Sequence, residues 1–363
     1  MRGTSAFDAW QQLYRAQDAW GAAHKMPPLL AHFGTSLVER AIIEAACRAA
    51  GKTFAQMLRD GSLGIELARI HPALAPHTPA DFLPEKPLPR IIARHTVGLA
   101  DPLTDDEVPA AERLDDGLPQ SLAACIRAYG LRHFKLKVNG DQPRDLERLR
   151  RIAAILRAHA PGDFRFSLDG NEQFKTLADF RAFWDALLRD DSLRTFLNHL
   201  LFVEQPLHRA QALQPDVGAA FAAWPARPPM IIDESDGALD SLPTALALGY
   251  HGTSHKNCKG IFKGIANRCL LADLQRRNPA APALMSGEDL CNVGPVALLQ
   301  DLAVMAALGI ESVERNGHHY NAGLSQFPAA IQRATLEHHA DLYHAAPAGW
   351  PTLAIREIGR AHV

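Results

Sequence analysis

Carboxylate side chains follow three successive apolar segments in the middle of the sequence. They are Asp169 in SLDGN, Glu204 in FVEQP and Asp233 in IIDES. Each motif alone also fits an exposed strand end or an ordinary turn, but the same arrangement on three successive segments favours one shared site. Carboxylate oxygens are the ligands that Mg²⁺ prefers, whereas zinc sites usually contain histidine or cysteine. The pattern therefore predicts that Asp169, Glu204 and Asp233 bind Mg²⁺.

Two lysines upstream of these acids are candidates for proton transfer. In the segment HFKLKV, Lys135 and Lys137 are two residues apart, so both lie on one face of a β-strand. The hydrophobic residues of the segment point to the other face. Burial of two ammonium groups is costly unless anions lie nearby. The segment therefore predicts that both lysines enter the site of the carboxylates, and a solvated edge strand is the alternative.

A third lysine ends a later strand-like segment, GTSHK. Lys256 is its last residue, and Lys259 in the following turn competes for the same role. Lys256 is favoured because it closes the predicted strand and shares a face with Ser254. The choice between the two lysines stays open at this point.

Two further residues are candidates for substrate binding. Glu288 follows the segment ALMSG, and His318 lies in the loop NGHHY, which also contains His319. The alternatives are an exposed acid at a strand end and a solvated loop histidine.

These residues need a scaffold that brings them together, and the chain alternates between strand-like and helix-like segments from about residue 90 onward. Eight strands are expected, the number that closes a parallel barrel with its active site at the C-terminal ends of the strands. A doubly wound sheet is less favoured because the chain has no glycine-rich phosphate-binding turn. The predicted strands are Arg90–Val97, His133–Val138, Phe164–Asp169, Leu201–Gln205, Met230–Glu234, Gly252–Lys256, Ala283–Gly287 and Ser312–Asn316.

The sequence divides into three parts. Residues 1–85 are expected to form a helical N-terminal capping region, residues 86–343 an α/β barrel, and residues 344–363 an extension that packs back on it. A segment with six prolines, Pro72–Pro89, is expected to link the first two parts. The helices expected outside the barrel are Ala6–Ala22, Thr35–Ala50, Phe54–Leu58 and Phe327–Tyr343.

Composition excludes several classes of function. The 363 residues carry 38 Lys and Arg against 40 Asp and Glu, a net charge of −2, so nucleic acid and anionic membranes are not expected partners. Five scattered cysteines without a CxxC pair indicate neither a disulfide framework nor a zinc knuckle. No apolar run has the length of a signal peptide or a membrane span, so a cytoplasmic protein is expected.

Taken in order, these motifs resemble the enolase superfamily and, within it, the mandelate racemase and muconate-lactonizing-enzyme group. The resemblance covers about residues 35–343. In that family, a KxK pair on the second barrel strand precedes metal-binding Asp, Glu and Asp on the third to fifth strands and a lysine on the sixth. The matching residues are Lys135, Lys137, Asp169, Glu204, Asp233 and Lys256. Glu234, beside the last acid, is expected to face the opposite side.

The resemblance implies a (β/α)7β barrel and a Mg²⁺-dependent isomerase or lyase, often a homo-oligomer. Such an enzyme removes the proton α to a small carboxylate through an ene-diolate. Lys137 would be the base, and Lys135 would lower its pKa or polarise the substrate. Lys256 on the opposite face permits racemisation or epimerisation, and syn-dehydration or cycloisomerisation are the other outcomes.

Departures from the family narrow these activities. The histidine on the seventh strand and the Asp-x-Asp on the eighth, which serve mandelate-racemase-like members and dipeptide epimerases, are both missing. The three-stranded meander that usually precedes the capping helices is also missing or incomplete, so either the chain starts late or another element replaces the lid. The alternative function is therefore a catalytically silent member that acts as a binding or assembly protein. A metal hydrolase is disfavoured because the first strand has no HxH.

Overall fold

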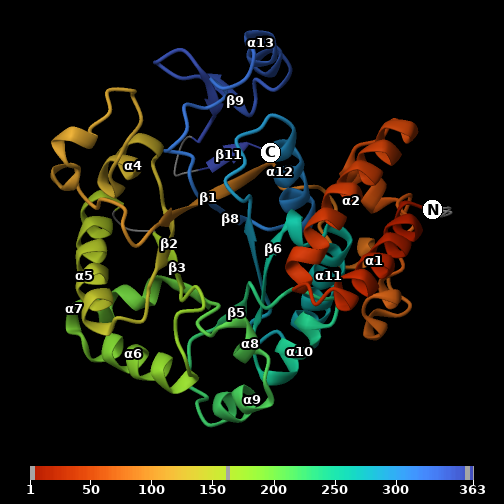
Figure 1. The fold of residues 1–363 in the computed structure, drawn as a ribbon, viewed down its shortest axis with the longest axis horizontal. Helices are drawn as coiled ribbons and strands as arrows, with labels where there is room; N and C mark the ends of the chain where they lie inside the picture. The colour runs from red at the N-terminus through yellow and green to blue at the C-terminus, as the bar shows by residue number, and fades with distance from the viewer. Residues whose placement is uncertain (1–4, 161–163, 356–359, 363) are drawn as a thin grey trace.

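Eight parallel strands close into a barrel at the centre of the molecule (Figure 1). The computed structural model describes residues 5–160, 164–355 and 360–362. The strands are neighbours in sequence order, and the last pairs with the first. Their bounds are β1 (Arg90–Val97), β2 (His133–Lys137), β3 (Arg165–Asp169), β4 (Leu200–Glu204), β5 (Met230–Ile232), β6 (Gly252–Lys256), β7 (Leu284–Glu288) and β8 (Ser312–Arg315).

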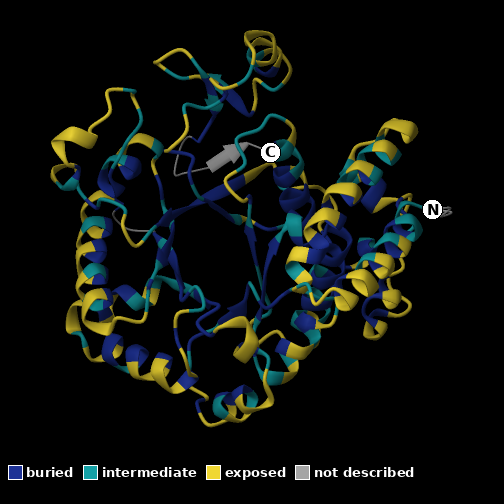
Figure 2. Cartoon of the chain, in the orientation of Figure 1, coloured by how far each residue is buried: buried dark blue, intermediate teal, exposed yellow. Residues whose placement is uncertain are grey.

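The predicted barrel is confirmed, and each strand ends within two residues of its predicted bounds. Helices follow the first seven strands and form the outer ring, so the predicted (β/α)7β order is also confirmed. Figure 2 shows their inner faces buried and their outer faces exposed. The ring consists of α4 (Leu122–Tyr129), α5 (Gln142–His159), α6 (Leu177–Arg189), α7 (Asp191–Arg194), α8 (Arg209–Ala212), α9 (Pro215–Ala222), α10 (Ser241–Leu248), α11 (Ile261–Arg277) and α12 (Val296–Leu308).

Arg94 of β1 fills the lumen below the strand ends. Its guanidinium donates hydrogen bonds to Ser286 Oγ at 2.6 Å and to the carbonyl oxygen of Ser312 at 2.8 Å. Because side chains alternate along a strand, Thr96 also points into the lumen and His95 between them points outward to the helices. The lumen at this level is therefore filled by side chains, as in other closed parallel barrels.

Helices precede the barrel, and the described residues before β1 contain no strand. They are α1 (Ala6–Ala23), α2 (Pro28–Ala50) and α3 (Phe54–Arg59). The second helix begins seven residues earlier than expected because Pro28 occupies its first turn, where proline needs no amide hydrogen. The rings of Phe7 and Trp10 lie 5.5 and 5.2 Å from that of Phe262 on α11, which fixes α1 against the side of the barrel (Figure 1).

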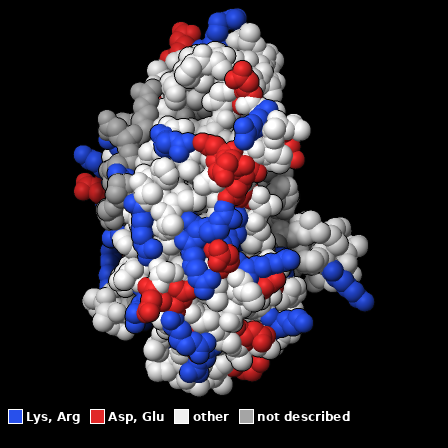
Figure 3. Space-filling model, turned by 90° about the vertical axis from the view of Figure 1, so that its left-hand side faces the viewer, with Lys and Arg blue, Asp and Glu red and all other residues white. Residues whose placement is uncertain are grey.

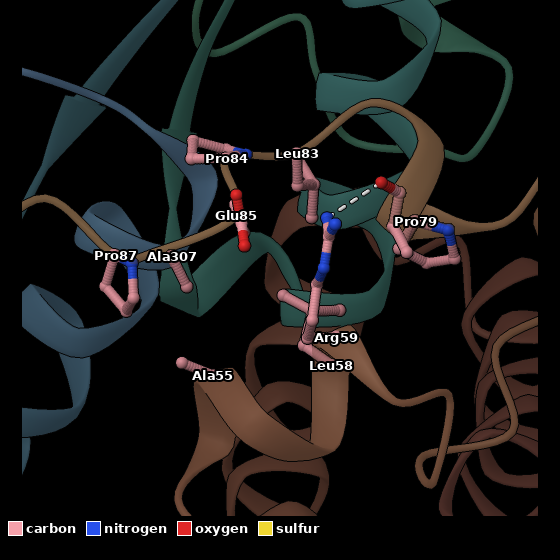
Figure 4. Close-up of a pocket in the computed structure, with 10 residues that line it drawn as sticks. Ala55, Leu58, Arg59, Pro79, Leu83, Pro84, Glu85, Pro87 and Ala307 are labelled. Carbon is pink, nitrogen blue, oxygen red and sulfur yellow. Dashed lines mark hydrogen bonds between the residues drawn. The ribbon is translucent and has the colours of Figure 1, made fainter.

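The proline-rich segment after α3 packs between that helix and α12. Arg59 of α3 donates a hydrogen bond to the carbonyl oxygen of Ala80 at 2.8 Å (Figure 4). A cavity of about 20 Å³ remains there, lined by residues such as Pro84 and Ala307 and by none of the charged residues at the strand ends. This segment contains two short 3₁₀ turns, Pro72–Leu74 and Pro79–Asp81. The other 3₁₀ turns of the described residues are Leu67–Arg69, Asp105–Glu107, Ala110–Glu112, Phe196–His199 and Asn257–Lys259.

The C-terminal part differs from the expectation of one long helix over Phe327–Tyr343. Helix α13 (Ala329–His338) is shorter, because Pro328 lies before its first turn and the chain then enters a two-stranded hairpin. The hairpin consists of β9 (Tyr343–Ala345) and β10 (Pro351–Leu353). Strand β11 (Arg360–His362) pairs antiparallel with the start of β1.

Among the described residues, no helix combines the length and the apolar character needed to cross a lipid bilayer. On the face shown in Figure 3, basic and acidic side chains are interspersed. This mixture agrees with the net charge of −2 and gives that face no broad surface of one sign.

Candidate active site

Strand register brings charged side chains of β2, β3 and β4 to one level at the mouth of the barrel. Lys137 is in register with Asp169, and Asp169 with Glu204. Neighbouring parallel strands are about 4.8 Å apart, so side chains on the same face at one level are within reach of each other. Three of the predicted site residues thus form one side of the mouth.

The opposite side of the mouth comes from β6, β7 and β8. Lys256 is in register with Glu288, and Glu288 with Glu314. Asp233 lies one residue beyond the end of β5 and completes the ring. Glu314 was not predicted as a site residue. It lies on the same face of β8 as Ser312, so strand alternation could have indicated that it points into the lumen.

Lys135 lies at the centre of this ring. Its Nζ is 2.6 Å from Glu314 Oε2 and 3.1 Å from both Asp169 Oδ2 and Glu204 Oε2. Burial alone would lower the pKa of Lys135, but the surrounding carboxylates raise it well above its ordinary value. Lys135 is therefore a fixed ammonium group, suited to neutralising anions and unsuited to accepting a proton.

Lys137 enters the same site from a position two residues further along β2, closer to solvent. Its Nζ donates a hydrogen bond to Asn171 Oδ1 and lies 3.2 Å from Asp169 Oδ2. Its side chain is 25 % exposed, whereas that of Lys135 is almost inaccessible. Of the two lysines, Lys137 is the one that a small molecule in the mouth can reach.

Asp233 binds two lysines that have different surroundings. Lys259 donates to its Oδ1 and backbone oxygen, both at 2.6 Å, and to the carbonyl oxygen of Ser254 at 2.9 Å. Lys256 bridges Asp233 Oδ2 at 2.9 Å and Glu288 Oε2 at 2.8 Å. The side chain of Lys256 is 14 % exposed and that of Lys259 only 3 %. Lys256 therefore faces the mouth, and Lys259 braces the turn after β5.

Glu288 and Glu314 are adjacent acids with opposite preferences for a proton. Burial and the charge of Glu314 raise the pKa of Glu288 to about 8. Burial would also raise the pKa of Glu314, but Lys135 lowers it to about 2. Thr96 Oγ1 donates a hydrogen bond to Glu314 Oε1 at 2.7 Å. The pair thus keeps a proton on Glu288 and the negative charge on Glu314 near neutral pH.

The expectation that Glu234 faces the opposite side of the fifth strand rests on strand alternation. Because β5 ends at Ile232, strand alternation does not determine where residues 233 and 234 point. Burial and the charges of Asp233 and Asp169 raise the pKa of Glu234 to about 7, so its carboxyl group lies within electrostatic reach of the ring.

The acids of the mouth have the chemistry of a site for a hard divalent cation. Glu204, Asp233 and Glu288 each offer one carboxylate oxygen, and these atoms lie within 4.8 Å of one another. Neither carboxylate oxygen of Glu204 accepts a hydrogen bond from the described residues, although both are buried. Asp169 borders the group through its contact with Lys135. An all-oxygen donor set fits Mg²⁺, and the buried carboxylate of Glu204 is held only by its ion pair with Lys135 among the described residues.

The structure does not bring His318 to this ring. Its imidazole packs edge-on against His95 and Tyr129, at 5.0 and 4.9 Å between ring centroids. His95 points outward from β1, so His318 lies behind the barrel wall. The predicted role of His318 in substrate binding therefore has no support from its position.

No protein-family model and no curated protein sequence matches the chain, whereas solved structures do. A putative isomerase from Sinorhizobium meliloti has a TM-score of 0.58 at 15 % identity, with 99 % of this chain and 75 % of that one covered. A dipeptide epimerase from Enterococcus faecalis V583 has a TM-score of 0.54 at 14 % identity, with 99 % and 78 % covered.

A third similar structure is an enolase from Bradyrhizobium complexed with magnesium and mandelic acid. Its TM-score is 0.50 at 17 % identity, with 84 % of this chain and 66 % of that one covered. This chain therefore spans about two thirds to three quarters of the length of these structures. At such identities the likeness shows a shared fold, a barrel of this kind with a region preceding it.

Proposed function

We propose that this chain is an enolase-superfamily enzyme that removes the proton α to the carboxylate of a small substrate with the help of Mg²⁺. The observation that carries this proposal is the position of Lys135, whose ammonium group contacts carboxylates from β3, β4 and β8 at 2.6–3.1 Å. A buried ring of this kind is costly for stability alone, which favours a functional reason for it. The fold shared with an enolase and with isomerases supports the same reaction class.

Asp169, Glu204 and Asp233 would hold the cation, with Glu288 beside them. The cation supplies Lewis-acid stabilisation for the second negative charge that develops on a carboxylate when its α-proton leaves. Lys135 adds a fixed positive charge to the same region. This charge would attract the substrate carboxylate toward the floor of the mouth and leave its α-carbon toward solvent.

Lys137 would take the α-proton. In this step the C–H bond breaks, the proton moves to a neutral Nζ of Lys137, and the electron pair enters the substrate carboxylate to give an ene-diolate. Asn171 and Asp169, which hold Nζ in this structure, orient the amine toward the mouth. The partial exposure of Lys137 permits this contact, whereas the buried Lys135 has none of the necessary access.

Lys256 would return the proton from the other side. Strands β2 and β6 are four positions apart in an eight-stranded barrel, so Lys137 and Lys256 face each other across the mouth. Two opposed amines support a transfer in which one face of the α-carbon loses a proton and the other face gains one. Racemisation or epimerisation is therefore the outcome that this arrangement supports best, ahead of elimination or cycloisomerisation.

The eighth strand argues against a substrate whose ammonium group must be bound there. Glu314 is occupied by Lys135 and Thr96, and Arg315 forms an ion pair with Asp289. Glu314, the one acid of β8, is therefore not free for a substrate ammonium group, and Arg315 as a cation would repel one. The substrate class that fits is a small carboxylate without such an amine.

Solvent-deuterium exchange tests this function. A set of carboxylic acids is incubated with the enzyme in D₂O, with and without Mg²⁺, and deuterium at the α-carbon is followed by NMR. We expect Mg²⁺-dependent incorporation that is lost in Lys137→Ala and kept in the control Lys175→Ala, which changes an exposed lysine. Exchange that Lys137→Ala leaves unchanged contradicts the role of Lys137. No exchange with any acid, despite tight Mg²⁺ binding, favours the alternative of a silent binding protein.

A further inference from the structure

A second group of metal-ligating side chains lies behind the barrel wall, away from the acids of the mouth. His95, Cys125 and His319 each offer one ligand atom, and these atoms all lie within 4.8 Å of one another. All three residues are more than nine-tenths buried. The group contains nitrogen and sulfur donors and no carboxylate, so its chemistry differs from that of the mouth.

Three separate segments contribute these ligands. His95 lies on β1 and points outward, because its neighbours Arg94 and Thr96 contact groups in the lumen. Cys125 lies in the middle of α4, and His319 lies in the loop that follows β8. A metal bound by the three residues would therefore join the first strand, the first barrel helix and the last barrel loop.

The histidines of this group have buried nitrogens that lack partners. Nδ1 of His95 and Nδ1 of His319 are buried, and neither has a hydrogen-bond partner among the described residues. An unpaired buried polar atom costs free energy, so it points to a ligand. Burial also lowers the pKa of both histidines, that of His319 to about 4, which keeps the imidazoles neutral and able to coordinate a metal.

His318 lies beside these three residues and could supply a fourth ligand. Its ring lies 5.0 Å from those of His95 and His319, measured between centroids. Its Nδ1 lies 3.2 Å from the carbonyl oxygen of Arg315 and donates to it, which leaves a lone pair on Nε2. Nε2 is buried and has no hydrogen-bond partner among the described residues. A backbone carbonyl that fixes the tautomer in this way is the usual outer-shell support of a metal-binding histidine.

We propose that His95, Cys125, His318 and His319 form a structural site for Zn²⁺ or a similar transition-metal ion. Three nitrogens and one sulfur suit the tetrahedral geometry of zinc, with bonds of about 2.0–2.1 Å to nitrogen and about 2.3 Å to sulfur. The ligand atoms of His95, Cys125 and His319 already lie within 4.8 Å of one another, so one ion placed between them would be near all three.

Binding at this site releases a proton. Burial raises the pKa of the Cys125 thiol to about 12, so the free residue holds its proton at neutral pH. On binding, the S–H bond of the thiol breaks and its proton goes to the solvent, and the resulting thiolate forms a bond to the metal. Affinity is therefore expected to rise with pH.

Cobalt substitution tests the proposal in the full-length chain. The protein is treated with a chelator, saturated with Mg²⁺ so that oxygen-rich sites are occupied, and titrated with Co²⁺. One equivalent should produce a thiolate-to-cobalt charge-transfer band and the visible bands of tetrahedral Co²⁺, and Zn²⁺ should displace both. The charge-transfer band should disappear in Cys125→Ser and persist in Cys269→Ser, which changes an equally buried cysteine on α11.

The histidines are tested in the same way. Loss of an outer-shell partner already costs about 10–100-fold in metal affinity, so His319→Gln should weaken Co²⁺ binding by more than that. If Cys125→Ser does not fold, zinc-edge X-ray absorption of the unchanged protein decides: sulfur and nitrogen neighbours support the site, and oxygen neighbours alone overturn it. Absence of the charge-transfer band in the unchanged protein, or its persistence in Cys125→Ser, also overturns the proposal.

Discussion

The ammonium group of Lys135 on β2 lies 2.6 Å from Oε2 of Glu314 on β8. Both strands flank β1, so this ion pair spans the first strand inside the lumen, and Thr96 of β1 binds the other carboxylate oxygen. Asp169 and Glu204 approach the same ammonium group from the third and fourth strands. One buried cation therefore holds Asp169, Glu204 and Glu314 together at the mouth of the barrel.

Replacing Glu314 with glutamine should lower the free energy of unfolding by about 3 kcal/mol, because it removes the carboxylate that lies nearest to the buried ammonium group of Lys135. Urea unfolding at pH 7 measures the change. The control is Glu311→Gln, which removes an exposed acid just before the same strand and should change stability by less than about 0.5 kcal/mol. Equal unfolding midpoints for the two variants would show that the ion pair contributes little.

Lys256 and Lys259 both bind Asp233 but should differ in the effect of substitution by methionine. Lys259→Met removes three buried contacts and should destabilise the protein by about 3 kcal/mol or more. Lys256→Met should cost less than half of that and lower deuterium exchange by at least about 100-fold. Urea unfolding and the exchange assay are measured on both variants. The reverse pattern would assign the functional role to Lys259.

Mg²⁺ should stabilise the folded protein through the acids of the mouth. A ligand at 100 times its Kd adds about 2.7 kcal/mol to the free energy of unfolding, which thermal unfolding detects as a higher Tm. Glu204→Gln should remove most of this shift, because Glu204 supplies buried carboxylate oxygens without other hydrogen bonds. Asp216→Asn, a change at an exposed acid, should keep it. A Mg²⁺ shift of equal size in Glu204→Gln would place the cation elsewhere.

The barrel could be predicted from the sequence because short strand-like segments alternate with helix-like segments from about residue 90 onward. Residues 133–137 show this most clearly, since two lysines alternate with buried hydrophobic residues and strand geometry alone assigns the two faces. The C-terminal helix was predicted too long because nothing local to Tyr343 distinguishes a helix end from a strand. Tyr343 belongs to a strand because it pairs with Leu353 in the hairpin, a contact between residues that are ten positions apart.

The position of a candidate-site residue could be derived from strand geometry only where the residue lies within a strand. Asp169 and Glu204 meet that condition, whereas Asp233 and Glu234 follow the end of β5 and take their positions from the turn. His95, Cys125 and His319 lie far apart in the sequence, and no spacing motif connects them. Only the pairing of β1 with β8 and the packing of α4 bring them together.

Glu39 connects the N-terminal helices to the barrel by binding the start of α11. The residue lies on α2, is completely buried, and accepts hydrogen bonds from the backbone nitrogens of Ile261 at 3.0 Å and Phe262 at 2.7 Å. The start of a helix has unpaired amide hydrogens, and a carboxylate from another element satisfies two of them here. Burial nevertheless raises the pKa of Glu39 to about 7, because it outweighs these bonds and the charge of Lys263.

The raised pKa of Glu39 predicts a specific dependence of stability on pH. The folded state binds a proton at Glu39 more tightly than the unfolded state, whose value is near 4.5. The contribution is therefore fully present below about pH 4.5 and is lost as the pH rises to about 7, a change of about 3 kcal/mol. Glu39→Gln cannot titrate, so its free energy of unfolding should fall less than that of the unchanged protein between pH 5 and pH 8. Glu44→Gln, on the same helix, should follow the unchanged protein, and parallel profiles for all three proteins would contradict the assignment.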